Sequence, residues 1–262
     1  MRELSDQEIK GIQMDVLSAI DEFCRNNNIK YSLSSGTMLG AIRHKGYIPW
    51  DDDIDILLYR DDYNRLIENF PQLYKGVYKI KSLERDGSYD RPYAIAYDDT
   101  TLFIEGKEVW GVKVDIFPMD DVPDNEKQWR KYNRRRLRMQ HLFLYTYNEK
   151  GSTILKTIYF KCIRFLMLFY SRRRLALRLD YISQKHNGKG YRRCFENSAG
   201  YHSKRPFDKS IFSEMALYPF EQRHYYGFSS ADVYLSAVYG DYMKLPPEEE
   251  RVTHHSFKAY KK

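Results

Sequence analysis

The sequence predicts an α+β fold, with a mixed β-sheet core flanked by helices and followed by a helical C-terminal subdomain. Short strand-like runs alternate with amphipathic helical patterns over residues 1–124, and long basic helix-like stretches follow. The charge divides in the same way: residues 1–126 carry 15 Lys and Arg against 25 Asp and Glu, whereas residues 127–262 carry 28 against 11. We therefore expect a core over 1–124 and a basic, mainly helical subdomain over 125–262.

Elements of the first half follow from local patterns. Ser5 and Glu8 form a capping box, after which apolar residues recur at helical spacing up to the stop at Asn26 to Asn28. Shorter helices are expected over 37–43 and 61–70. Strands are expected over 29–33, 54–59, 78–83, 93–97, 101–104 and 109–117.

The second half predicts helices over 125–147, 153–170 and 172–186, and a further helix that begins with a Ser229–Asp232 capping pair and ends before Gly240. The stretch 153–170 is strongly apolar. Three basic residues interrupt it, and a spanning helix needs about 20 mostly uncharged residues, so we do not expect it to cross a membrane.

The amino-acid composition limits the classes of protein to which this chain can belong. A chain of 262 residues with 24 Tyr and 14 Phe can bury a sizeable core and is unlike a disordered protein. Its three cysteines, Cys24, Cys162 and Cys194, lack CxxC spacing, so we expect reduced thiols and no structural zinc. No cleavable leader pattern opens the sequence, and the cytoplasm is the expected location.

Four carboxylates within five residues precede and enter an apolar strand pattern. In a strand, Asp53 and Asp55 at i and i+2 face the same side, with Asp51 behind them. Carboxylate oxygens suit Mg²⁺ or Mn²⁺. A calcium loop also begins with this spacing, but its sixth and twelfth positions require Gly and Glu, where this chain has Ile56 and Asp62. We therefore predict Mg²⁺, or Mn²⁺, on Asp53 and Asp55.

A small-residue turn precedes the acidic segment. Gly36 after Ser35 can bring backbone amides close to a phosphate, and a helix beginning at Thr37 would favour an anion. No GxxxxGK[ST] sequence is present, which excludes a P-loop. Arg43 follows and offers a bidentate guanidinium to phosphate. We expect Ser35, Gly36, Thr37 and Arg43 to contact a phosphorylated ligand.

A further carboxylate lies in the alternating segment 112–117. Three apolar side chains share one face of this expected strand, whereas Lys113, Asp115 and Phe117 share the other. Asp115 can therefore meet Asp53 and Asp55 across a sheet. We predict that these three aspartates are catalytic and bind one metal ion.

Three segments resemble the LicD family of phosphotransferases: SSGTMLGAIRHKGYIPWDDDIDI at 34–56, VDIFPMDDVP at 114–123 and YLSAVYGDYMKLPP at 234–247, with His254 beyond them. The resemblance implies a nucleotidyltransferase-like fold. It also implies transfer of a phospho-alcohol, most often phosphocholine from CDP-choline, to a hydroxyl of a cell-surface glycan such as lipopolysaccharide or teichoic acid, or to its lipid-linked precursor, with release of CMP.

The same resemblance assigns residues. Gly36 and Thr37 match the family's turn, Asp53 and Asp55 its metal pair, and Asp115 a third carboxylate. His254 matches a C-terminal histidine, so the C-terminal segment is expected to return towards the active site. The role of His254 stays open between a phosphate or nucleotide contact and an exposed tail.

Two other functions remain as alternatives. A metal-dependent glycosyltransferase also holds a nucleotide diphosphate through a DxD element. A basic nucleic-acid-binding protein would account for the cationic second half, but no recognisable binding motif supports it, and we expect no nucleic-acid partner. The basic residues at 127–138 and 172–174 are expected instead to contact an anionic acceptor or the inner face of the cell membrane.

Overall fold

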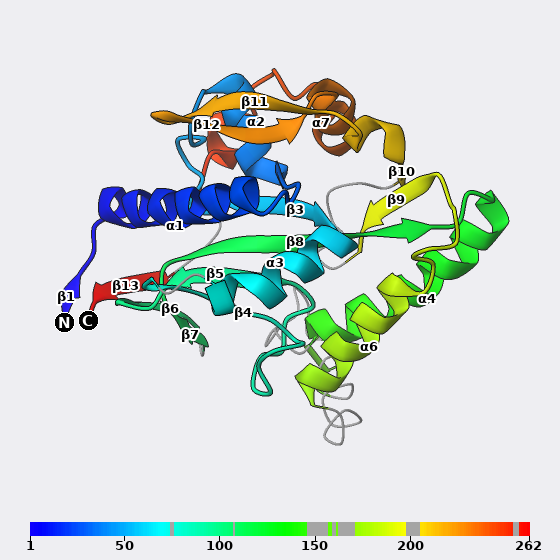
Figure 1. Ribbon diagram of the computed structural model, residues 1–262, viewed down its shortest axis with the longest axis horizontal. Coiled ribbons are helices and arrows are strands. Elements are labelled where there is room, and N and C mark those ends of the chain that lie inside the picture. The colour runs from blue at the N-terminus through cyan, green and yellow to red at the C-terminus, as the bar shows by residue number, and fades with distance from the viewer. Residues whose placement is uncertain are drawn as a thin grey trace.

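The computed structural model has the predicted α+β architecture, with a seven-stranded mixed sheet at its centre (Figure 1). Its longest strand, β8 (Lys113–Val122), pairs in parallel with β3 (Asp55–Tyr59). On its other edge β8 pairs antiparallel with β5 (Ala94–Asp98) and β9 (Arg193–Glu196). The sheet is completed by β2 (Ser32–Leu33), β4 (Tyr78–Lys81) and β10 (Phe207–Asp208). The structure describes residues 1–73, 76–106, 108–145, 157–158, 161, 171–197, 205–253 and 257–262.

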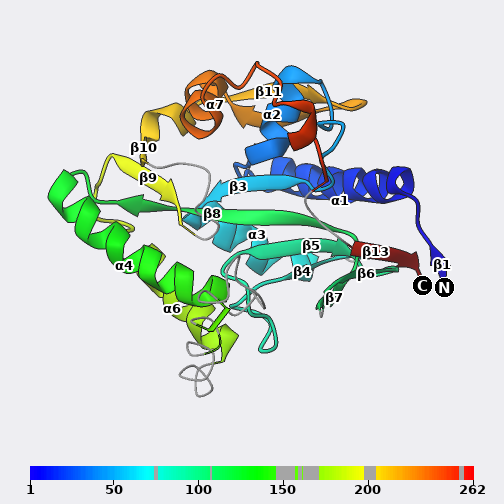
Figure 2. The same ribbon diagram turned by 180° about the vertical axis from the view of Figure 1, so that it is seen from behind.

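A second, four-stranded antiparallel sheet joins the two ends of the chain. Its order is β1 (Arg2–Glu3), β13 (Phe257–Lys261), β6 (Thr101–Glu105) and β7 (Glu108–Trp110). Because β13 pairs with both β1 and β6, the termini lie side by side, as both views of the molecule show (Figures 1 and 2). The C-terminal residues are thus anchored to the first half of the chain.

Helices cover the central sheet and extend beyond it. The helices α1 (Asp6–Asn26) and α3 (Arg60–Leu73) pack against its strands. On the α1 side of β3 lie α2 (Ser35–Arg43), α7 (Ala231–Tyr239) and a hairpin of β11 (Met215–Phe220) and β12 (Arg223–Phe228). The remaining long helices, α4 (Glu126–Tyr145) and α6 (Arg172–Gln184), pack against each other at another end of the molecule (Figure 1).

The predicted capping box at the start of α1 is confirmed. The Ser5 side chain accepts a hydrogen bond from the Glu8 amide, and the Glu8 carboxylate accepts one from the Ser5 amide at 2.9 Å. An N-cap of this kind stabilises a helix by about 1 kcal/mol. The helix ends at Asn26, where the sequence places its stop.

The single strand expected over 109–117 is wrong: it is two strands in different sheets, β7 and β8. The break falls at Gly111, where a Cβ atom would lie 2.0 Å from the carbonyl oxygen of Asp98. Next to it, the amide of Val112 donates to the Thr101 hydroxyl at 2.8 Å. The alternation of apolar and polar residues continues past Gly111, so hydrophobicity alone does not reveal that the backbone of Asp98 comes close at this point and that the strand breaks there.

The second half contains more strand than its pattern predicts. Besides α4, α6, α7 and two 3₁₀ turns, η1 (Lys209–Phe212) and η2 (Glu248–Glu250), it contributes β9 to β13, and β9 extends the central sheet itself. Most of the helix expected over 153–170 lies outside the described residues. The Ser229–Asp232 capping pair is also wrong, since α7 follows Ser230, and Asp232 instead accepts from the Tyr242 hydroxyl at 2.8 Å. The boundary near residue 124 falls between β8 and α4 and stays a prediction.

The main hydrophobic core combines both halves of the chain. It includes Val16 and Leu33 from the first half together with Phe220, Phe228 and Tyr234 from the second, all buried. The thiols of Cys24 and Cys194 are buried and unbridged, whereas Cys162 lies outside the described residues. Within the described part of the chain, every helix is too short or too polar to cross a membrane.

Candidate active site

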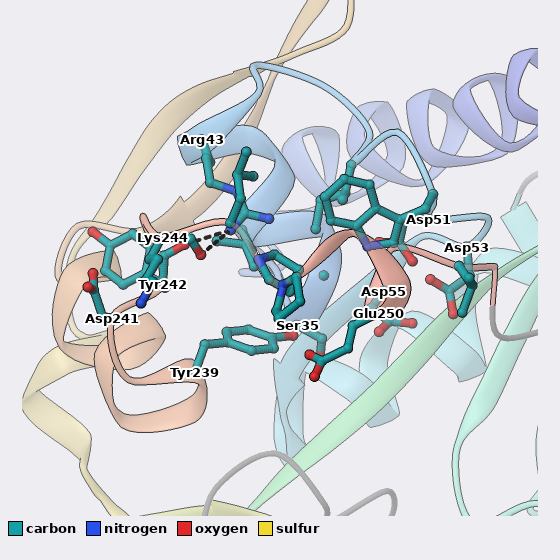
Figure 3. A pocket seen from close by; sticks show the side chains of 18 of the residues that line it. Ser35, Arg43, Asp51, Asp53, Asp55, Tyr239, Asp241, Tyr242, Lys244 and Glu250 are labelled. Atoms are coloured by element: carbon teal, nitrogen blue, oxygen red, sulfur yellow. Dashed lines mark hydrogen bonds between the residues drawn. The ribbon is translucent and has the colours of Figure 1, made fainter.

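Six of the eight predicted site residues line a cavity of about 990 Å³, within the range of small-molecule sites (Figure 3). Three parts of the chain line it: the start of α2, the acidic segment with β8, and residues 239–252. Carboxylates dominate the charge of its wall, with Arg43 and Lys244 as the cations. The six carboxylates are Asp51, Asp53, Asp55, Asp115, Asp241 and Glu250.

The parallel pairing of β3 and β8 brings two of the predicted aspartates together. Asp55 is the register partner of Asp115, and the amide of Asp115 donates to the carbonyl of Ile54 at 2.9 Å. The Thr37 hydroxyl accepts from the Asp55 amide at 2.8 Å, which fixes the first residue of β3. The predicted meeting of Asp55 and Asp115 across a sheet is therefore observed.

Asp53 lies before β3 rather than in it, within a compact acidic loop. In the described part of the chain, Asp51, Asp52 and Asp53 form the group of three or more possible metal ligands whose oxygens all lie within 4.8 Å of one another. Gln13 of α1 anchors this loop by donating to the Asp52 carbonyl at 2.9 Å. This cluster of carboxylate oxygens therefore comes from three consecutive residues. Asp53 of the cluster lines the same cavity as Asp55 and Asp115.

The carboxylates destabilise one another's charge. Burial, followed by repulsion from Asp53 and Asp52, raises the pKa of Asp51 to about 7. Burial, followed by repulsion from Asp53 and Asp115, raises the pKa of Asp55 well above its usual range. A divalent cation would relieve this repulsion, and carboxylate oxygens are the donors that Mg²⁺ and Mn²⁺ prefer. The residues present fit such an ion.

Asp115 has a counter-charge of its own. The Lys113 ammonium lies 2.7 Å from both Asp115 oxygens, and both side chains are buried. Burial, the largest influence, would lower the pKa of Lys113, but the charge of Asp115, Tyr93 and the hydrogen bond to Asp115 together raise that pKa above its usual value. The predicted shared face of Lys113 and Asp115 is confirmed, and it holds an ion pair.

The helix α2 begins at Ser35, two residues before the expected start at Thr37, and its first residues lie against the acidic loop. A Cβ atom at Gly36 would lie 2.5 Å from a carboxylate oxygen of Asp51, so glycine allows this approach. Ser35 has a positive φ of 48°, and its amide donates to the Tyr234 hydroxyl at 3.1 Å. Ser35 and Gly36 line the cavity, whereas Thr37 is buried behind it. Phosphate binding by this turn stays a prediction.

Arg43 lines the cavity and fixes its C-terminal wall. One guanidinium nitrogen donates to the carbonyls of Tyr242 at 2.7 Å and Lys244 at 3.4 Å (Figure 3). Partial burial lowers the pKa of Arg43. A contact with a phosphate stays a prediction for Arg43. His254 lies outside the described residues.

Sequence reasoning missed the wall residues of the C-terminal segment. Tyr239 ends α7, and Gly240 with a φ of 70° redirects the chain so that Asp241 lines the cavity. Burial, aided by Tyr234 and then by the acidic residues beginning with Asp55, raises the pKa of Tyr239 well above its usual range. The YGDYM sequence was part of the family resemblance, but nothing in it indicated that its residues would line this cavity.

Two kinds of comparison with known proteins show the family of this chain. Residues 28–149 match the family model "LicD/FKTN/FKRP, nucleotidyltransferase domain". The chain is 31% identical over 269 aligned positions to the lipopolysaccharide cholinephosphotransferase LicD of Haemophilus influenzae, covering 99% of both chains. An uncharacterized protein of Rickettsia prowazekii is 37% identical over 115 residues, 40% of this chain and 41% of its own. Since the match to the Haemophilus protein runs from end to end, this chain belongs to the LicD family.

Proposed function

We propose that this protein transfers phosphocholine from CDP-choline to a hydroxyl of lipopolysaccharide, or of a similar cell-surface glycan or its lipid-linked precursor, and releases CMP. One observation carries the proposal: a cavity walled by carboxylates lies in a chain that is 31% identical, from end to end, to a lipopolysaccharide cholinephosphotransferase. The cavity volume of about 990 Å³ suits a nucleotide-linked donor.

Metal dependence is part of the proposal. Asp53 and Asp55, with Asp51 in the same loop, would hold one Mg²⁺. A bound Mg²⁺ would neutralise charge on the donor diphosphate. Arg43 and Lys244 line the same cavity and supply further positive charge to the phosphates.

The reaction breaks the phosphoanhydride bond of the donor and forms a phosphodiester bond to the acceptor. The acceptor oxygen attacks the phosphorus that carries choline, and the bond from that phosphorus to the bridging oxygen of CMP breaks. Asp115 accepts the proton of the attacking hydroxyl, and the electron pair of the broken bond leaves with CMP. The protein's contribution is mainly to align these groups and to stabilise charge.

The lining also suits a cationic alcohol. Asp241 and Tyr242 lie at the end of the cavity away from Asp53, and the ring of Tyr239 points towards Ser35 (Figure 3). Carboxylates and aromatic rings stabilise a quaternary ammonium group. Choline fits this wall better than an uncharged alcohol such as ribitol.

A comparison of donors, supplied one at a time, tests the proposed function. Purified protein is incubated with Mg²⁺, an acceptor glycan and, in turn, CDP-choline, CDP-ribitol or a UDP-sugar, and the glycan is then weighed by mass spectrometry. We expect phosphocholine on the glycan together with free CMP. Transfer of a sugar without phosphate would contradict the proposal and identify a glycosyltransferase.

Peripheral membrane contact is a further part of the proposal, at the cytoplasmic face where a lipid-linked acceptor would be reached. Four cations of α4 recur at helical spacing on one exposed face: Lys127, Lys131, Arg134 and Arg138. By contrast, Arg136 is fully buried on the opposite face. Anionic lipid head groups attract such a cationic face.

A further inference from the structure

The contact between Lys113 and Asp115 assigns different roles to the site's carboxylates. The two residues are i and i+2 on β8 and therefore face the same side of the strand. The Lys113 ammonium is 2.7 Å from each Asp115 oxygen, and the side chains are only 10% and 9% exposed. Both oxygens of Asp115 are thus occupied by one fixed positive charge.

Two cations lie behind the site, and they contact different carboxylates directly. Lys113 and Arg91 line a smaller cavity of about 90 Å³ that also reaches Asp53 and Asp115. Arg91 donates to Glu108 through two guanidinium nitrogens, and the charge of Asp115 also acts on Arg91, but both oxygens of Asp115 contact the Lys113 ammonium directly. Asp115 is therefore the counter-ion of Lys113.

A divalent cation at Asp115 would have to share oxygens with the ammonium. Two positive charges a few ångströms apart in a buried site repel each other strongly. The compact oxygen cluster in the described residues is Asp51, Asp52 and Asp53; Asp55 and Asp115 lie outside it, and of these two only Asp115 has an ammonium at both oxygens. A hydroxyl donor meets no such repulsion, because an ionised carboxylate has about four acceptor positions.

We propose that Lys113 is a positioning residue that reserves Asp115 for the acceptor hydroxyl and limits the site to one divalent cation, held by the acidic loop at 51–55. This inference rests on the proposed metal-dependent transfer, and it removes Asp115 from the predicted metal ligands. The attacking hydroxyl donates to an Asp115 oxygen, and its proton passes to that carboxylate as the new ester bond forms.

Manganese binding without substrate tests the inference. Mn²⁺ is titrated into the full chain at fixed pH, and free Mn²⁺ is followed by electron paramagnetic resonance. We expect one Mn²⁺ per wild-type chain. Asp115→Asn should keep the Mn²⁺ dissociation constant within about twofold of wild type, while Asp53→Asn should raise it at least about tenfold.

Removing the Lys113 ammonium should turn Asp115 into a metal ligand. Lys113→Met should tighten Mn²⁺ binding at least about fivefold or add a second ion, because Asp115 becomes available as a ligand. Asp115→Asn in the Lys113→Met background should abolish that gain. Lys209→Met is the matched control, since it breaks the Lys209–Asp121 pair outside the cavity and should leave Mn²⁺ binding unchanged.

Circular dichroism establishes that each variant is folded, and if Lys113→Met does not fold, Asp115→Asn alone decides. Equal weakening of Mn²⁺ binding by Asp115→Asn and Asp53→Asn would overturn the inference and leave metal-dependent transfer standing. Two Mn²⁺ ions on wild type would also overturn it. A wild-type chain that binds no Mn²⁺ would overturn both the inference and the metal dependence of the proposed function.

Discussion

At the scale of single residues, the site is defined by charge that the protein does not neutralise by itself. Asp51 and Asp55 have raised pKa values because they are buried beside other carboxylates, whereas Asp115 has Lys113 at both oxygens. Strongly perturbed carboxylates in a cavity are a physical indicator of a functional site. The aspartates therefore differ in their electrostatic surroundings although they line one cavity, and we expect them to differ in role.

Asp53→Asn should abolish metal binding and lower the rate of CMP release at least about 100-fold, because an amide is a weaker ligand than a carboxylate for a hard cation. The measurement is CMP released from CDP-choline in the presence of acceptor and Mg²⁺. Asp61→Asn on the exposed start of α3 is the matched control and should keep wild-type activity. Undiminished metal-dependent release by Asp53→Asn would contradict the assignment.

The raised pKa of Asp51 predicts how stability depends on pH. This carboxyl titrates near 7 in the folded protein and at about 3.9 in an unfolded chain, so between these values the folded state binds more protons. Without divalent cations, the melting temperature should therefore fall as pH rises from 4 to 7. Thermal unfolding with and without Mg²⁺ should show stabilisation by the ion that is larger at pH 8 than at pH 5.

The Asp51→Asn variant is the control for this dependence. It removes the buried charge, so the decline in melting temperature between pH 4 and pH 7 should become shallower. An unchanged decline in Asp51→Asn would assign the dependence to other groups, with Asp55 next, since its pKa is raised by the same causes.

At the scale of elements, the sequence predicted a boundary correctly where the residues that set the boundary lie within or next to the element itself. The capping box and the stop of α1 were predicted from sequence, as was the acidic entry to β3. The split of 109–117 was not, because Gly111 is required by the backbone of Asp98 rather than by its own neighbours. The face shared by Lys113 and Asp115 was predicted, but their ion pair depends on burial that periodicity does not show.

The turn into α2 yields a prediction of its own. Gly36→Ala places a Cβ atom 2.5 Å from an oxygen of Asp51 and should displace the acidic loop. We expect Mn²⁺ affinity to fall at least about tenfold, as measured by titration, because the oxygens of the loop lose their mutual geometry.

The matched substitution is Gly11→Ala in α1, where nothing lies within 4 Å of the added Cβ. It should leave Mn²⁺ affinity unchanged and raise the free energy of unfolding by about 0.5–1 kcal/mol, since alanine favours a helix over glycine. If both variants behaved alike, Gly36 would have no specific role at the acidic loop.

At the scale of the whole molecule, the site is completed by chain that lies far away in sequence. Residues 239–252 form one wall of the cavity more than 200 positions after Gly36, and β13 then pairs with β6 to fasten this segment. The return of the C-terminal segment was expected from family resemblance, but its contacts were not. Tyr239 and Glu250 became recognisable as lining residues only through tertiary packing.

The separation of charge between the two halves predicts how the molecule meets a membrane. Lys131, Arg134 and Arg138 lie on the exposed face of α4, and each cation near an anionic surface contributes about 1 kcal/mol of binding. Changing all three to Glu should lower co-sedimentation with phosphatidylglycerol vesicles at least about tenfold at 0.1 M salt. Binding by wild type should weaken as salt is raised.

A triple variant with the same change in net charge separates geometry from bulk attraction. The control variant replaces three exposed lysines outside α4 by Glu: Lys30, Lys79 and Lys258. It should reduce vesicle binding far less. Equal loss in the two triple variants would show that net charge alone attracts the protein, with no preferred face. Neither variant alters a residue that lines the carboxylate cavity, so CMP release with a soluble acceptor should stay at the wild-type rate in both.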